Sequence, residues 1–597
     1  MSYDPFVLPF SIGLVIVVIL ILWKYFRWIF SHEKAERVKI LKLIFSFKLF
    51  SVIKEIFMEV LFHRRIFKIN PVLGYMHSSF AFGWFLLILG GTIESKMHNH
   101  HAFNMFYEPI FFKFFSHNID GFPFASGFKF LMDLILLYIL SGLMLAMAKR
   151  LYKKMFGMKK TTKLRLIDKL ALTSLWCIFP LRLLAESFTS AQYHNGGFLT
   201  DNFGNILAKF LPVDQLEYPA WWAYSIALGV FFVMLPYSRY MHIPTEMVLI
   251  ILRKAGFKTE KKYTGFSRVE VQSCSRCGIC LDACQVYATT QRNKMLPAYF
   301  LQSVRFNKKG KQGLTDCLMC GRCQEVCPVG IGINAIRRVK RNELFDEKGA
   351  EFEYLEESSI KSKKADVIYF AGCMTHLTPT IKRSMVALLK KAEINFWFMD
   401  EDSSICCGRP LQVLGKEKDA NILADKNREL IANSGAELLV TSCPICYKIF
   451  KEEYNLNIKV QHHTEYLNEL VNIGKLKPAN LNFSAVYHDP CDLGRGSGIY
   501  NQPRELLGRI SRLNKSENEK EMALCCGSSL ANLPAGFDDK EFMASEAAEQ
   551  LCVSNPDKLI TACPLCKKAF AQACNERKTS NQVDVKDIAE VLAEAVA

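Results

Sequence analysis

The chain has 597 residues, and at roughly 150 residues per domain this length predicts several domains rather than one core. Half of its residues are apolar, yet 75 Lys and Arg residues against 58 Asp and Glu residues leave a net charge of +17. This combination excludes a disordered chain and does not fit an ordinary soluble enzyme. Of the 21 cysteines only Cys177 precedes residue 274, and the others stand mostly in CxxC or CC groups, which indicates metal ligands rather than a secreted disulfide scaffold.

Apolar segments dominate the first 255 residues. Three runs of 19, 25 and 21 residues carry no charge, and each is close to the ~20 residues that cross the hydrocarbon layer as a helix. Two further apolar runs carry a few ionisable side chains, so we expect five spans. The first run lacks a basic leader and a small-residue cleavage site, so we expect no cleavable signal peptide. In chain order the expected spans are residues 5–23, 69–93, 127–148, 170–188 and 218–238.

The loops between these spans differ in positive charge. Residues 31–70 and 149–169 hold nine Lys and Arg residues each, whereas residues 94–126 hold two and residues 189–219 hold one. Because Lys and Arg are retained on the cytoplasmic side of short loops, we expect the amino terminus outside and all residues after Tyr240 in the cytoplasm, with the chain in the inner membrane. This topology accounts for much of the basic excess, so nucleic acid is not expected as a partner.

Two histidines are candidates for haem ligands. His77 is expected about 9 Å inside the second span from its cytoplasmic end, at the rise of about 1.5 Å per helical residue, and His242 closes the fifth span at the same face. Imidazoles at similar depth on two helices can supply both axial nitrogens of a b-type haem. The alternative is a histidine that bonds a backbone carbonyl or lies among lipid headgroups.

A resemblance favours the haem. Residues 63–94 and 221–242 resemble the five-helix cytochrome b subunit of respiratory nitrate reductase, and more closely its relatives fused to heterodisulfide-reductase-type iron–sulfur proteins. That cytochrome uses two histidine pairs, but here the positions that match the second pair are Leu87 and Tyr224. The resemblance therefore implies one haem b, on the cytoplasmic side between His77 and His242. The other histidines of this region are interpreted as loop or interfacial residues: His63, His98, His100, His101 and His117.

Three ionisable residues lie inside the expected spans, where such groups are functional candidates by default. Asp133 is expected about 9 Å from the outer end of its helix, and Arg182 and Glu186 stand four residues apart toward the outer end of theirs. We interpret them as a charge pair that locks two helices. A quinone or proton site is the alternative.

Two cysteine runs between residues 256 and 350 have ferredoxin spacing. Each has the form C-x2-C-x2-C-x3-C, and Pro328 follows the second run. In such pairs, three cysteines of one run and the last cysteine of the other bind one [4Fe–4S] cubane. Zinc knuckles are the alternative, but zinc sites pair two CxxC units instead. We therefore expect a helical dicluster domain, with one cubane on Cys274, Cys277, Cys280 and Cys327 and the other on Cys317, Cys320, Cys323 and Cys284.

An internal repeat with a period of about 119 residues fills the rest of the chain. Each copy has a single cysteine, an adjacent CC pair and a CPxC group, and apolar, β-branched runs precede the first and the last of these. Each copy is therefore expected to be an α/β unit whose strands deliver cysteines at their carboxyl ends. The cysteines are Cys373, Cys406, Cys407, Cys443 and Cys446 in the first copy and Cys491, Cys525, Cys526, Cys563 and Cys566 in the second.

These copies resemble the CCG domains of heterodisulfide reductase, a family in which such five-cysteine sets bind noncubane [4Fe–4S] clusters. The similarity covers residues 365–597 and implies one noncubane cluster on each set. One cluster plus a structural zinc is the alternative. Cys177, Cys552 and Cys574 lie outside every motif and are expected to be buried thiols.

The expected fold class is therefore multidomain. It comprises an all-α five-helix membrane domain at residues 1–255, a helical dicluster ferredoxin domain at 256–350, and two tandem α/β CCG domains at 365–480 and 481–597. The catalytic residues stay unknown. The sequence has no flavin or nicotinamide motif, because the glycines at 494–498 lack a full GxGxxG context.

These parts predict a membrane-bound oxidoreductase with two cubane clusters, one or two noncubane clusters and one haem b. Such a protein passes electrons between a cytosolic donor and a membrane quinone such as menaquinone. Relatives of this architecture receive electrons from electron-transfer flavoprotein, so the resemblance implies that protein or another cytosolic flavoprotein as partner. Two alternatives stay open: a heterodisulfide-reductase-type thiol/disulfide oxidoreductase, and the iron–sulfur relay subunit of a lactate or glycolate dehydrogenase complex.

Overall fold

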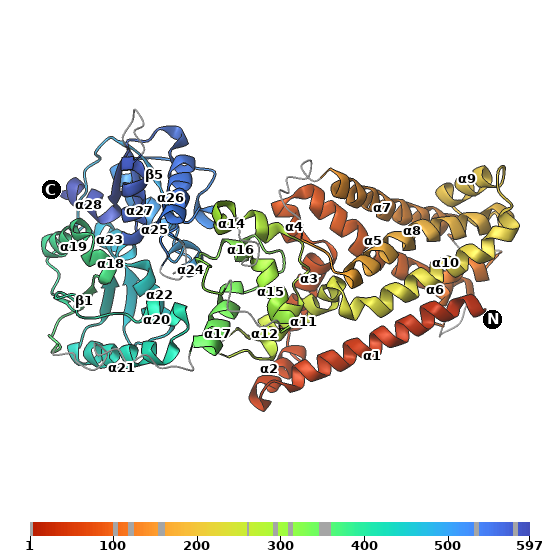
Figure 1. Ribbon diagram of the computed structural model, residues 1–597, viewed down its shortest axis with the longest axis horizontal. Coiled ribbons are helices and arrows are strands. Elements are labelled where there is room, and N and C mark those ends of the chain that lie inside the picture. Colours follow the sequence, from red (N-terminus) through yellow and green to blue (C-terminus); the bar gives the residue numbers. More distant parts are fainter. Residues whose placement is uncertain are drawn as a thin grey trace. The chain divides into compact units, whose positions relative to one another are not determined.

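The chain folds into two compact units, Met1–Thr259 with Thr264–Gly278, and Glu260–Tyr263 with Ile279–Ala597. In this computed structural model the first unit is helical, and the second combines helices with two small sheets (Figure 1). The four domain ranges expected from the sequence stay a prediction, and the Cys274–Cys277 segment belongs to the first unit. The structure describes residues 4–99, 105–117, 124–152, 162–259, 262–290, 296–307, 314–345, 360–529, 536–576 and 583–597.

Five long helices form most of the first unit. In the described part of the chain, five helices are long and apolar enough to cross a membrane, which confirms the expected number. Most extend beyond the apolar run that predicted them, because residues at the helix ends can be polar and still continue the helix. The helices are α1 (Leu8–Phe30), α5 (Pro71–Asn99), α7 (Ala125–Leu151), α8 (Leu166–Tyr193) and α10 (Val213–Met234).

Shorter helices connect and extend these five. Between α1 and α5 they are amphipathic or basic, and after α10 two single turns lead into a further helix that begins at His242. In chain order they are η1 (Pro5–Val7), α2 (Lys34–Ile44), α3 (Lys48–Ile56), η2 (Phe57–Leu61), α4 (Arg64–Ile69), α6 (Glu108–Phe115), α9 (Phe198–Leu207), η4 (Leu235–Tyr237), η5 (Arg239–Met241), α11 (His242–Lys254) and α12 (Gly265–Gln272).

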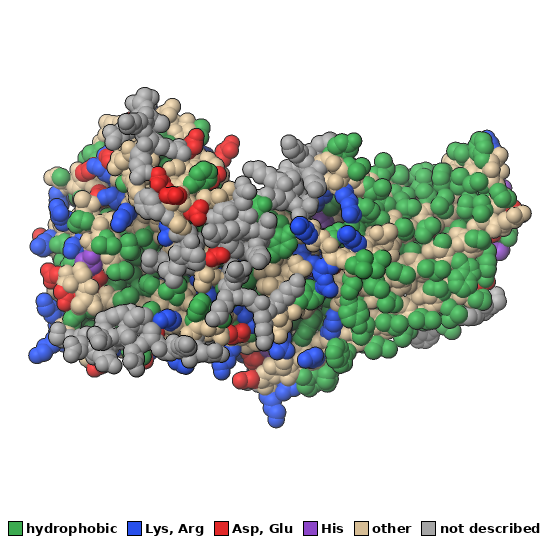
Figure 2. All heavy atoms as spheres, viewed as in Figure 1, with side chains coloured by type: hydrophobic (Ala, Val, Ile, Leu, Met, Phe, Trp, Pro, Cys, Tyr) green, Lys and Arg blue, Asp and Glu red, His purple; other side chains and the backbone are tan. Residues whose placement is uncertain are grey.

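Apolar side chains cover the outside of the long helices. Ile12, Leu22, Phe130 and Met144 are all more than half exposed. Figure 2 shows this apolar surface, with Lys and Arg side chains gathered mainly at one end of the helices. A continuous apolar surface of this kind suits lipid and not water.

Glycines allow two of the long helices to approach closely. The helix α10 packs against α1 and α8, and α5 packs against α7. A Cβ atom on Gly13 of α1 would lie 2.8 Å from the Cα atom of Gly229 on α10, and one on Gly229 would overlap the carbonyl group of Pro9. Small residues at such crossings let apolar helices gain packing contacts that lipid alone does not drive.

Short helices surround the ferredoxin-type cysteines of the second unit. The last of them, α17, is amphipathic and buries Ile333, Ile336 and Val339. In chain order they are α13 (Ile279–Asp282), α14 (Gln285–Thr290), α15 (Pro297–Arg305), α16 (Arg322–Glu325) and α17 (Ile333–Phe345). The expected helical character of this region is confirmed.

Each cysteine-rich repeat forms a four-stranded parallel sheet, in the orders β2-β1-β3-β4 and β6-β5-β7-β8. The central strands β1 and β5 are buried along their whole length, as is typical of parallel sheets with helices on both faces. The expected α/β units are confirmed. The strands are β1 (Val367–Phe370), β2 (Phe396–Phe398), β3 (Leu438–Thr441), β4 (Lys459–His462), β5 (Ser484–Tyr487), β6 (Arg512–Asn514), β7 (Lys558–Thr561) and β8 (Asp584–Asp587).

The two repeats share one hydrophobic core. The helices α19 and α23 of the first repeat pack against α25 and α28 of the second, and Leu388, Leu470, Leu507 and Leu592 are all at most 2% exposed there. The helices of both repeats are α18 (Cys373–His376), α19 (Pro379–Lys391), α20 (Arg409–Leu414), α21 (Glu417–Ser434), α22 (Pro444–Glu452), α23 (His463–Asn472), α24 (Gly494–Ser497), α25 (Asn501–Ile510), η8 (Lys520–Met522), α26 (Phe537–Leu551), η9 (Cys552–Ser554), α27 (Pro564–Glu576) and α28 (Ile588–Val596).

The crossing of α1 and α10 predicts that Gly229→Leu destabilises the first unit. The new side chain has no space beside Pro9, and overpacking of this kind costs about 1–3 kcal/mol. We expect a lower thermal midpoint for the purified chain in detergent. The matched control is Gly127→Leu at the start of α7, where a Cβ atom meets nothing within 4 Å. Equal midpoints for the two variants would contradict the close approach.

Candidate functional site

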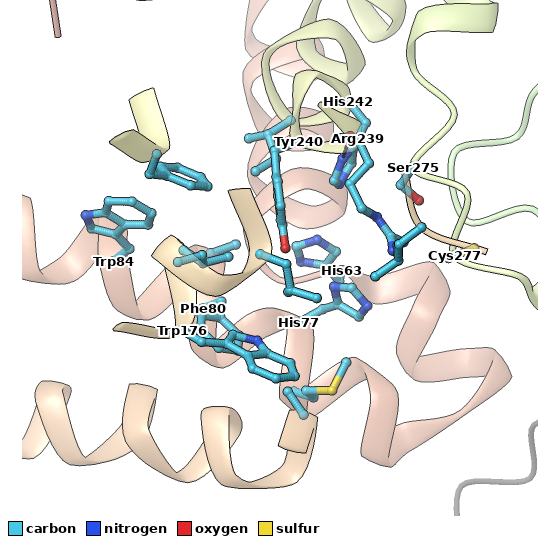
Figure 3. A pocket seen from close by; sticks show the side chains of 18 of the residues that line it. His63, His77, Phe80, Trp84, Trp176, Arg239, Tyr240, His242, Ser275 and Cys277 are labelled. Atoms are coloured by element: carbon cyan, nitrogen blue, oxygen red, sulfur yellow. Dashed lines mark hydrogen bonds between the residues drawn. The ribbon is translucent and has the colours of Figure 1, made fainter. Parts of the chain in front are cut away.

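A cavity of about 530 Å³ lies at one end of the long helices in the first unit. His77 lines it from α5, and His242 lines it from the first position of α11, so the structure brings the two sequence-predicted histidines to one cavity (Figure 3). The sequence places His242 at the end of the fifth span. In the structure the α-helix α10 ends at Met234, and two single turns, η4 and η5, carry the chain to His242.

A third histidine lines the same cavity. His63 stands between η2 and α4, and its ring lies 5.5 Å from the ring of His77. The sequence interpretation of His63 as a loop residue is correct for its backbone but misses its place in the cavity. Its left-handed backbone, with φ of 55°, turns the chain back toward α5. The only signal in the sequence is that His63 opens the segment that resembles the cytochrome.

Backbone carbonyl groups orient two of these rings. The Nδ1 atom of His242 lies 2.7 Å from the carbonyl oxygen of Arg239, and that of His63 lies 3.1 Å from the carbonyl oxygen of Leu61. An Nδ1–H that donates to a carbonyl fixes the tautomer with the lone pair on Nε2, which is the form that binds a metal. The sequence left open that these histidines only bond a backbone carbonyl group. A histidine that binds a metal usually makes the same bond through its other ring nitrogen, so the bond is compatible with both interpretations.

The rest of the cavity wall suits a flat apolar group with charged edges. Phe80, Trp84 and Trp176 supply aromatic surface, and Lys149 and Arg239 supply positive charge. A haem has an apolar macrocycle and two carboxylate groups, so these residues fit it.

Glu246 is a buried acid on the same wall. It stands four residues after His242 on α11, one helical turn further, and is 8% exposed. Burial raises the pKa of this carboxyl group to about 8, while the charge of Arg65 lowers it and that of Glu59 raises it. The group therefore holds a proton at neutral pH inside the cavity.

The positions matching a second histidine pair are packed apolar core. Leu87 and Tyr224 are 1% and 2% exposed. The Arg182 guanidinium bonds Glu186 of its own helix at 2.8 Å. The Asp133 carboxylate accepts hydrogen bonds from the backbone N–H groups of Leu199 and Thr200 at the start of α9. In place of the expected charge pair between helices, Arg182 pairs with Glu186 within α8 and bonds the Tyr224 side chain of α10, while Asp133 caps α9.

Four ferredoxin-type cysteines surround one small cavity of about 30 Å³ in the second unit. They come from both runs, as the interleaved assignment requires: Cys284, Cys317, Cys320 and Cys323. Burial and the neighbouring thiols raise the pKa of Cys284 to about 12, while the buried guanidinium of Arg337 lowers it. Of the other expected set, Cys274 and Cys277 belong to the first unit, and Cys280 and Cys327 to the second.

The five thiols of the first repeat converge at the carboxyl edge of its sheet. Cys373 follows β1, and Cys443 follows β3 and caps α22, whose first residue is the proline of the CPxC group. The sulfur atoms of Cys407 and Cys446 lie 3.3 Å apart, and Cys406 and Cys443 are electrostatic neighbours of Cys373 or Cys407. Parallel strands that end at a common edge produce this convergence.

Iron is well matched to this group of thiols. Burial, with the neighbouring thiols, raises the pKa of Cys373 to about 12. Several thiolates this close repel one another, so they lose their protons together only when cations compensate their charge. Iron provides that compensation in iron–sulfur clusters.

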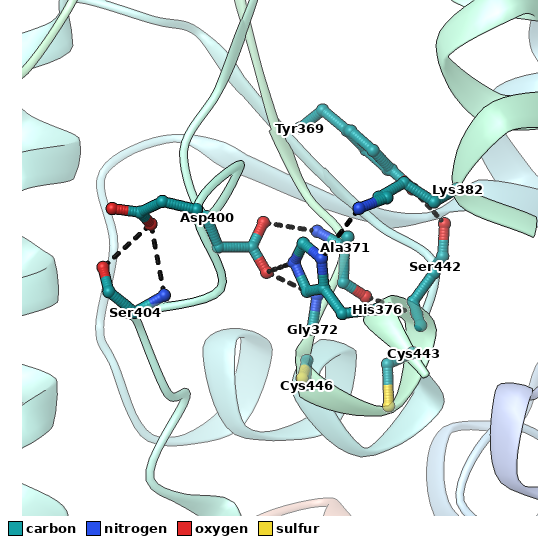
Figure 4. A network of polar contacts seen from close by, with 12 residues as sticks. Tyr369, Ala371, Gly372, His376, Lys382, Asp400, Ser404, Ser442, Cys443 and Cys446 are labelled. Atoms are coloured by element: carbon teal, nitrogen blue, oxygen red, sulfur yellow. Dashed lines mark hydrogen bonds and ion pairs between the residues drawn. The ribbon is translucent and has the colours of Figure 1, made fainter. Parts of the chain in front are cut away.

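Asp400 fixes the loop that carries Cys373 (Figure 4). Its carboxylate accepts hydrogen bonds from the backbone N–H groups of Ala371 and Gly372 at 2.8 and 2.7 Å, and His376 lies 3.2 Å from it. Gly372 has φ of 85°, and a Cβ atom there would lie 2.9 Å from the sulfur of Cys446. Only glycine therefore allows the loop to pass so close to the thiols.

The second repeat gathers its thiols in the same way and adds one from the ferredoxin region. The thiol of Cys525 contacts those of Cys491 and Cys526, and it also forms a hydrogen bond with the thiol of Cys320. Gln285 holds the two parts together, because its Oε1 atom accepts from the N–H of Cys525 at 2.7 Å and its Nε2 atom donates to the carbonyl of Cys525 at 3.2 Å. In the sequence Gln285 occupies the place where a proline often follows the first cysteine run.

The cysteines outside the motifs are less buried than expected. Cys177 is exposed on α8, and Cys552 and Cys574 are half-buried. The expectation for Cys177 was wrong because the outer face of an apolar membrane-type helix is exposed although it avoids water. His100 and His101 lie outside the described residues, and His117 stacks on Tyr193. Within the described ranges no group of three or more His, Cys, Asp or Glu side chains is arranged to hold a single metal ion.

Two family models match the parts of the chain that carry these cysteines. The model of a 4Fe-4S dicluster domain matches residues 270–331, and the model of the cysteine-rich domain called CCG matches residues 367–451 and 485–571. The domains contain the cysteine sets described above. The chain is therefore an iron–sulfur oxidoreductase, and its cysteine-rich part is similar to heterodisulfide reductase.

Individual relatives extend this similarity. The chain is 26% identical to the EtfAB:quinone oxidoreductase of Syntrophomonas wolfei, over 88% of each chain. It is 27% identical to one subunit of the dihydromethanophenazine:CoB–CoM heterodisulfide reductase of Methanosarcina barkeri, over 56% of this chain and 96% of that subunit. It is 22% identical to the probable iron-sulfur-binding oxidoreductase FadF of Bacillus subtilis, over 80% of this chain and 84% of FadF.

Glu246 predicts a specific pH dependence of stability. Because its pKa is raised on folding from 4.5 to about 8, stability present below pH 4.5 is lost as the pH rises toward 8. Glu246→Gln is therefore expected to stabilise the chain at pH 9, by on the order of 3 kcal/mol, and to have little effect at pH 5. Thermal unfolding in detergent at the two pH values measures this difference.

The control for this experiment is Glu270→Gln. Glu270 is also buried, but it forms an ion pair with Arg253 at 3.2 Å, so its loss is expected to stabilise the chain at neither pH. An equal gain for Glu246→Gln at both pH values would show that the carboxyl group does not titrate between them.

Gln285 predicts a coupling between the ferredoxin region and the second repeat. Gln285→Ala leaves the N–H and the carbonyl of Cys525 without their partner, at a cost of about 1–3 kcal/mol each. We expect a lower unfolding midpoint and less iron per chain after purification. Gln302→Ala, on the half-buried side of α15, is the control and should change neither quantity. Full iron content in Gln285→Ala would refute the coupling.

Proposed function

We propose that this chain is a membrane-bound oxidoreductase that passes electrons between a cytosolic flavoprotein and the membrane quinone pool. The observation that carries the proposal is the cavity with His77 and His242 at one end of five membrane-type helices, in a chain whose other unit gathers cluster-type cysteines. The name of the Syntrophomonas relative supports electron-transfer flavoprotein as the donor and a quinone, such as menaquinone, as the acceptor.

The proposed cofactors follow the cysteine and histidine sets. Cys284, Cys317, Cys320 and Cys323 hold one cubane cluster and the remaining ferredoxin-type cysteines hold the other, while each CCG repeat holds a noncubane cluster and His77 with His242 hold one haem b. When bound, these groups accept and release single electrons. The chain's own residues set their spacing and burial. The cavity's cations Lys149 and Arg239 offset the haem carboxylates.

The proposed topology follows the charge of the loops. The amino terminus lies outside, and the iron–sulfur domains lie in the cytoplasm, where thiols stay reduced and able to bind iron. The cavity with His77 then lies at the cytoplasmic end of the helices, on the same side as the donor. The chain is placed in the inner membrane of the cell.

A second candidate function is reductive cleavage of a disulfide, the reaction that the name of the Methanosarcina relative describes. The specific observation in its favour is that both repeats keep all five cysteines and that both sets converge. Under this function the CCG repeats bind a disulfide, and two electrons from a reduced membrane carrier, with two protons, convert it to two thiols.

A mixing experiment separates the two functions. The haem Soret band of the purified chain in detergent is followed while reduced electron-transfer flavoprotein and then a menaquinone analogue are added. Reduction followed by reoxidation is expected. A band that ignores the flavoprotein but responds to thiols or disulfides would favour the second function, and the lack of any haem band would refute the histidine assignment.

The haem assignment predicts the behaviour of three histidine variants. His77→Ala and His242→Ala are expected to lose the low-spin haem spectrum, because each removes one of the two imidazoles that would hold the haem. His63→Ala should keep it. His98→Ala, on the same helix as His77 but 21 residues further on, is the matched control. Loss of the spectrum in His63→Ala but not in His242→Ala would transfer the second ligand to His63.

A further inference from the structure

One buried carboxylate in the first unit has an unusual set of partners. Asp168 is the third residue of α8 and is 1% exposed. Its Oδ1 atom accepts a hydrogen bond from the backbone N–H of Arg239 at 2.8 Å. Its Oδ2 atom accepts from the Nη2 atom of Arg276 at 2.5 Å and from the backbone N–H of Arg165 at 3.2 Å. The carboxylate thus joins three segments that are far apart in the sequence.

The first of these contacts leads to the histidine cavity. Arg239 is held through its N–H by Asp168, and its carbonyl oxygen lies 2.7 Å from the Nδ1 atom of His242. Arg239 therefore connects the two, because its N–H bonds the Asp168 carboxylate and its carbonyl group orients the His242 ring. A shift of the turn at Arg239 would shift that ring with it.

The second contact leads to the first cysteine run. Arg276 stands between Cys274 and Cys277 and has a left-handed backbone with φ of 55°. Its carbonyl oxygen accepts hydrogen bonds from the hydroxyl of Thr162 at 2.7 Å and from the guanidinium of Arg239 at 3.3 Å. Both its side chain and its backbone are therefore tied to the wall of the membrane-type helices.

The cysteine run meets the histidine cavity directly. Ser275 and Cys277 line the same cavity as His77 and His242 (Figure 3). A loop that carries a cluster ligand thus forms part of the wall of the cavity proposed for the haem. Electron transfer between two groups falls steeply with distance, so a shared wall is the arrangement that rapid transfer needs.

We propose that Asp168 is a positioning residue that holds His242 and the Cys274–Cys277 loop at a fixed separation on one cavity wall, and that the cluster bound by this loop is the direct electron partner of the haem. The second half rests on the proposed function. The first half concerns only contacts within the chain, and it stands without any cofactor.

Energy alone does not explain the pair of Asp168 and Arg276. Both side chains are almost fully buried, at 1% and 5% exposure, and a buried ion pair is often no more stabilising than apolar residues of the same size. Such a pair does fix geometry, because moving either group strands the other charge in an apolar environment. The two residues are 108 positions apart in the sequence, so the pair fixes the position of one segment relative to the other.

Hydrogen–deuterium exchange of the full chain in detergent tests the first half. Asp168→Asn is expected to speed exchange about tenfold both in the turn 239–242 and in the loop 274–277, because both lose a charge-assisted bond. Arg276→Gln should speed exchange in the loop and leave the turn unchanged. Glu270→Gln, which removes a buried acid that bonds Arg253 and Thr259 instead, should change neither.

Three results would refute the proposal that Asp168 is a positioning residue. They are an unchanged turn in Asp168→Asn, a turn that loosens equally in Arg276→Gln, and an equal rise in the Glu270→Gln control, which would reveal general destabilisation instead. Because Arg276→Gln keeps the carboxylate and its backbone contacts, it remains informative if the Asp168 variant does not fold.

Stopped-flow spectroscopy of the loaded protein tests the second half. With haem and iron contents equal to those of the parent, Asp168→Asn is expected to slow haem reduction by the reduced clusters at least about tenfold, and Glu270→Gln is expected to leave it unchanged. An unchanged rate would refute the direct partnership. If neither the parent nor the variants bind haem, the proposed function fails. The exchange experiment still decides whether Asp168 holds the turn and the loop in position.

Discussion

The convergence of many thiols at the edges of two parallel sheets is the constraint on which the second unit depends. A parallel sheet places the ends of all its strands on one side, so cysteines that follow β1 and β3, or β5 and β7, meet there without a long detour of the chain. Neighbouring thiolates repel one another, so this edge is stable only with protons or with iron. The fold therefore determines the metal chemistry. The strand order determines which thiols meet, and the repulsion between their thiolates means that they bind protons or iron.

The first unit solves the opposite problem, since the outer faces of its long helices are apolar and its polar groups must find partners inside. Asp133 caps a helix, Arg182 pairs with Glu186 one turn away, and Asp168 joins two arginines near the histidine cavity. Each arrangement gives a buried charge a partner inside the helical unit. The aromatic and cationic wall beside His77 follows the same rule, because it pairs an apolar interior with a charged rim at the end of the helices.

Periodic features of the sequence predicted most of this architecture. The apolar runs predicted five helices, and the repeated spacing of the cysteines predicted two α/β repeats, because both depend on local chemistry repeated along the chain. What escaped prediction depends on contacts between distant residues. Gln285 clamps Cys525 across 240 positions, His63 reaches the cavity through a left-handed turn, and Arg276 finds Asp168 across 108. The exposure of Cys177 was misjudged for another reason, since a helix such as α8 also carries apolar side chains on its outer face.

The hydrogen bond between the thiols of Cys320 and Cys525 makes the two repeats structurally different. Their sequences and sheets match, yet in the described contacts the ferredoxin thiol adjoins the second repeat's cysteines. After a duplication, identical halves are free to diverge once their neighbours differ. The first copy also meets the ferredoxin region, but it does so through helix α20, where the carbonyl group of Val413 accepts a hydrogen bond from Arg341 at 2.6 Å. Its Cys373 thiol is exposed, whereas the matching Cys491 of the second copy is half-buried, so the thiols of the first copy are the more accessible set.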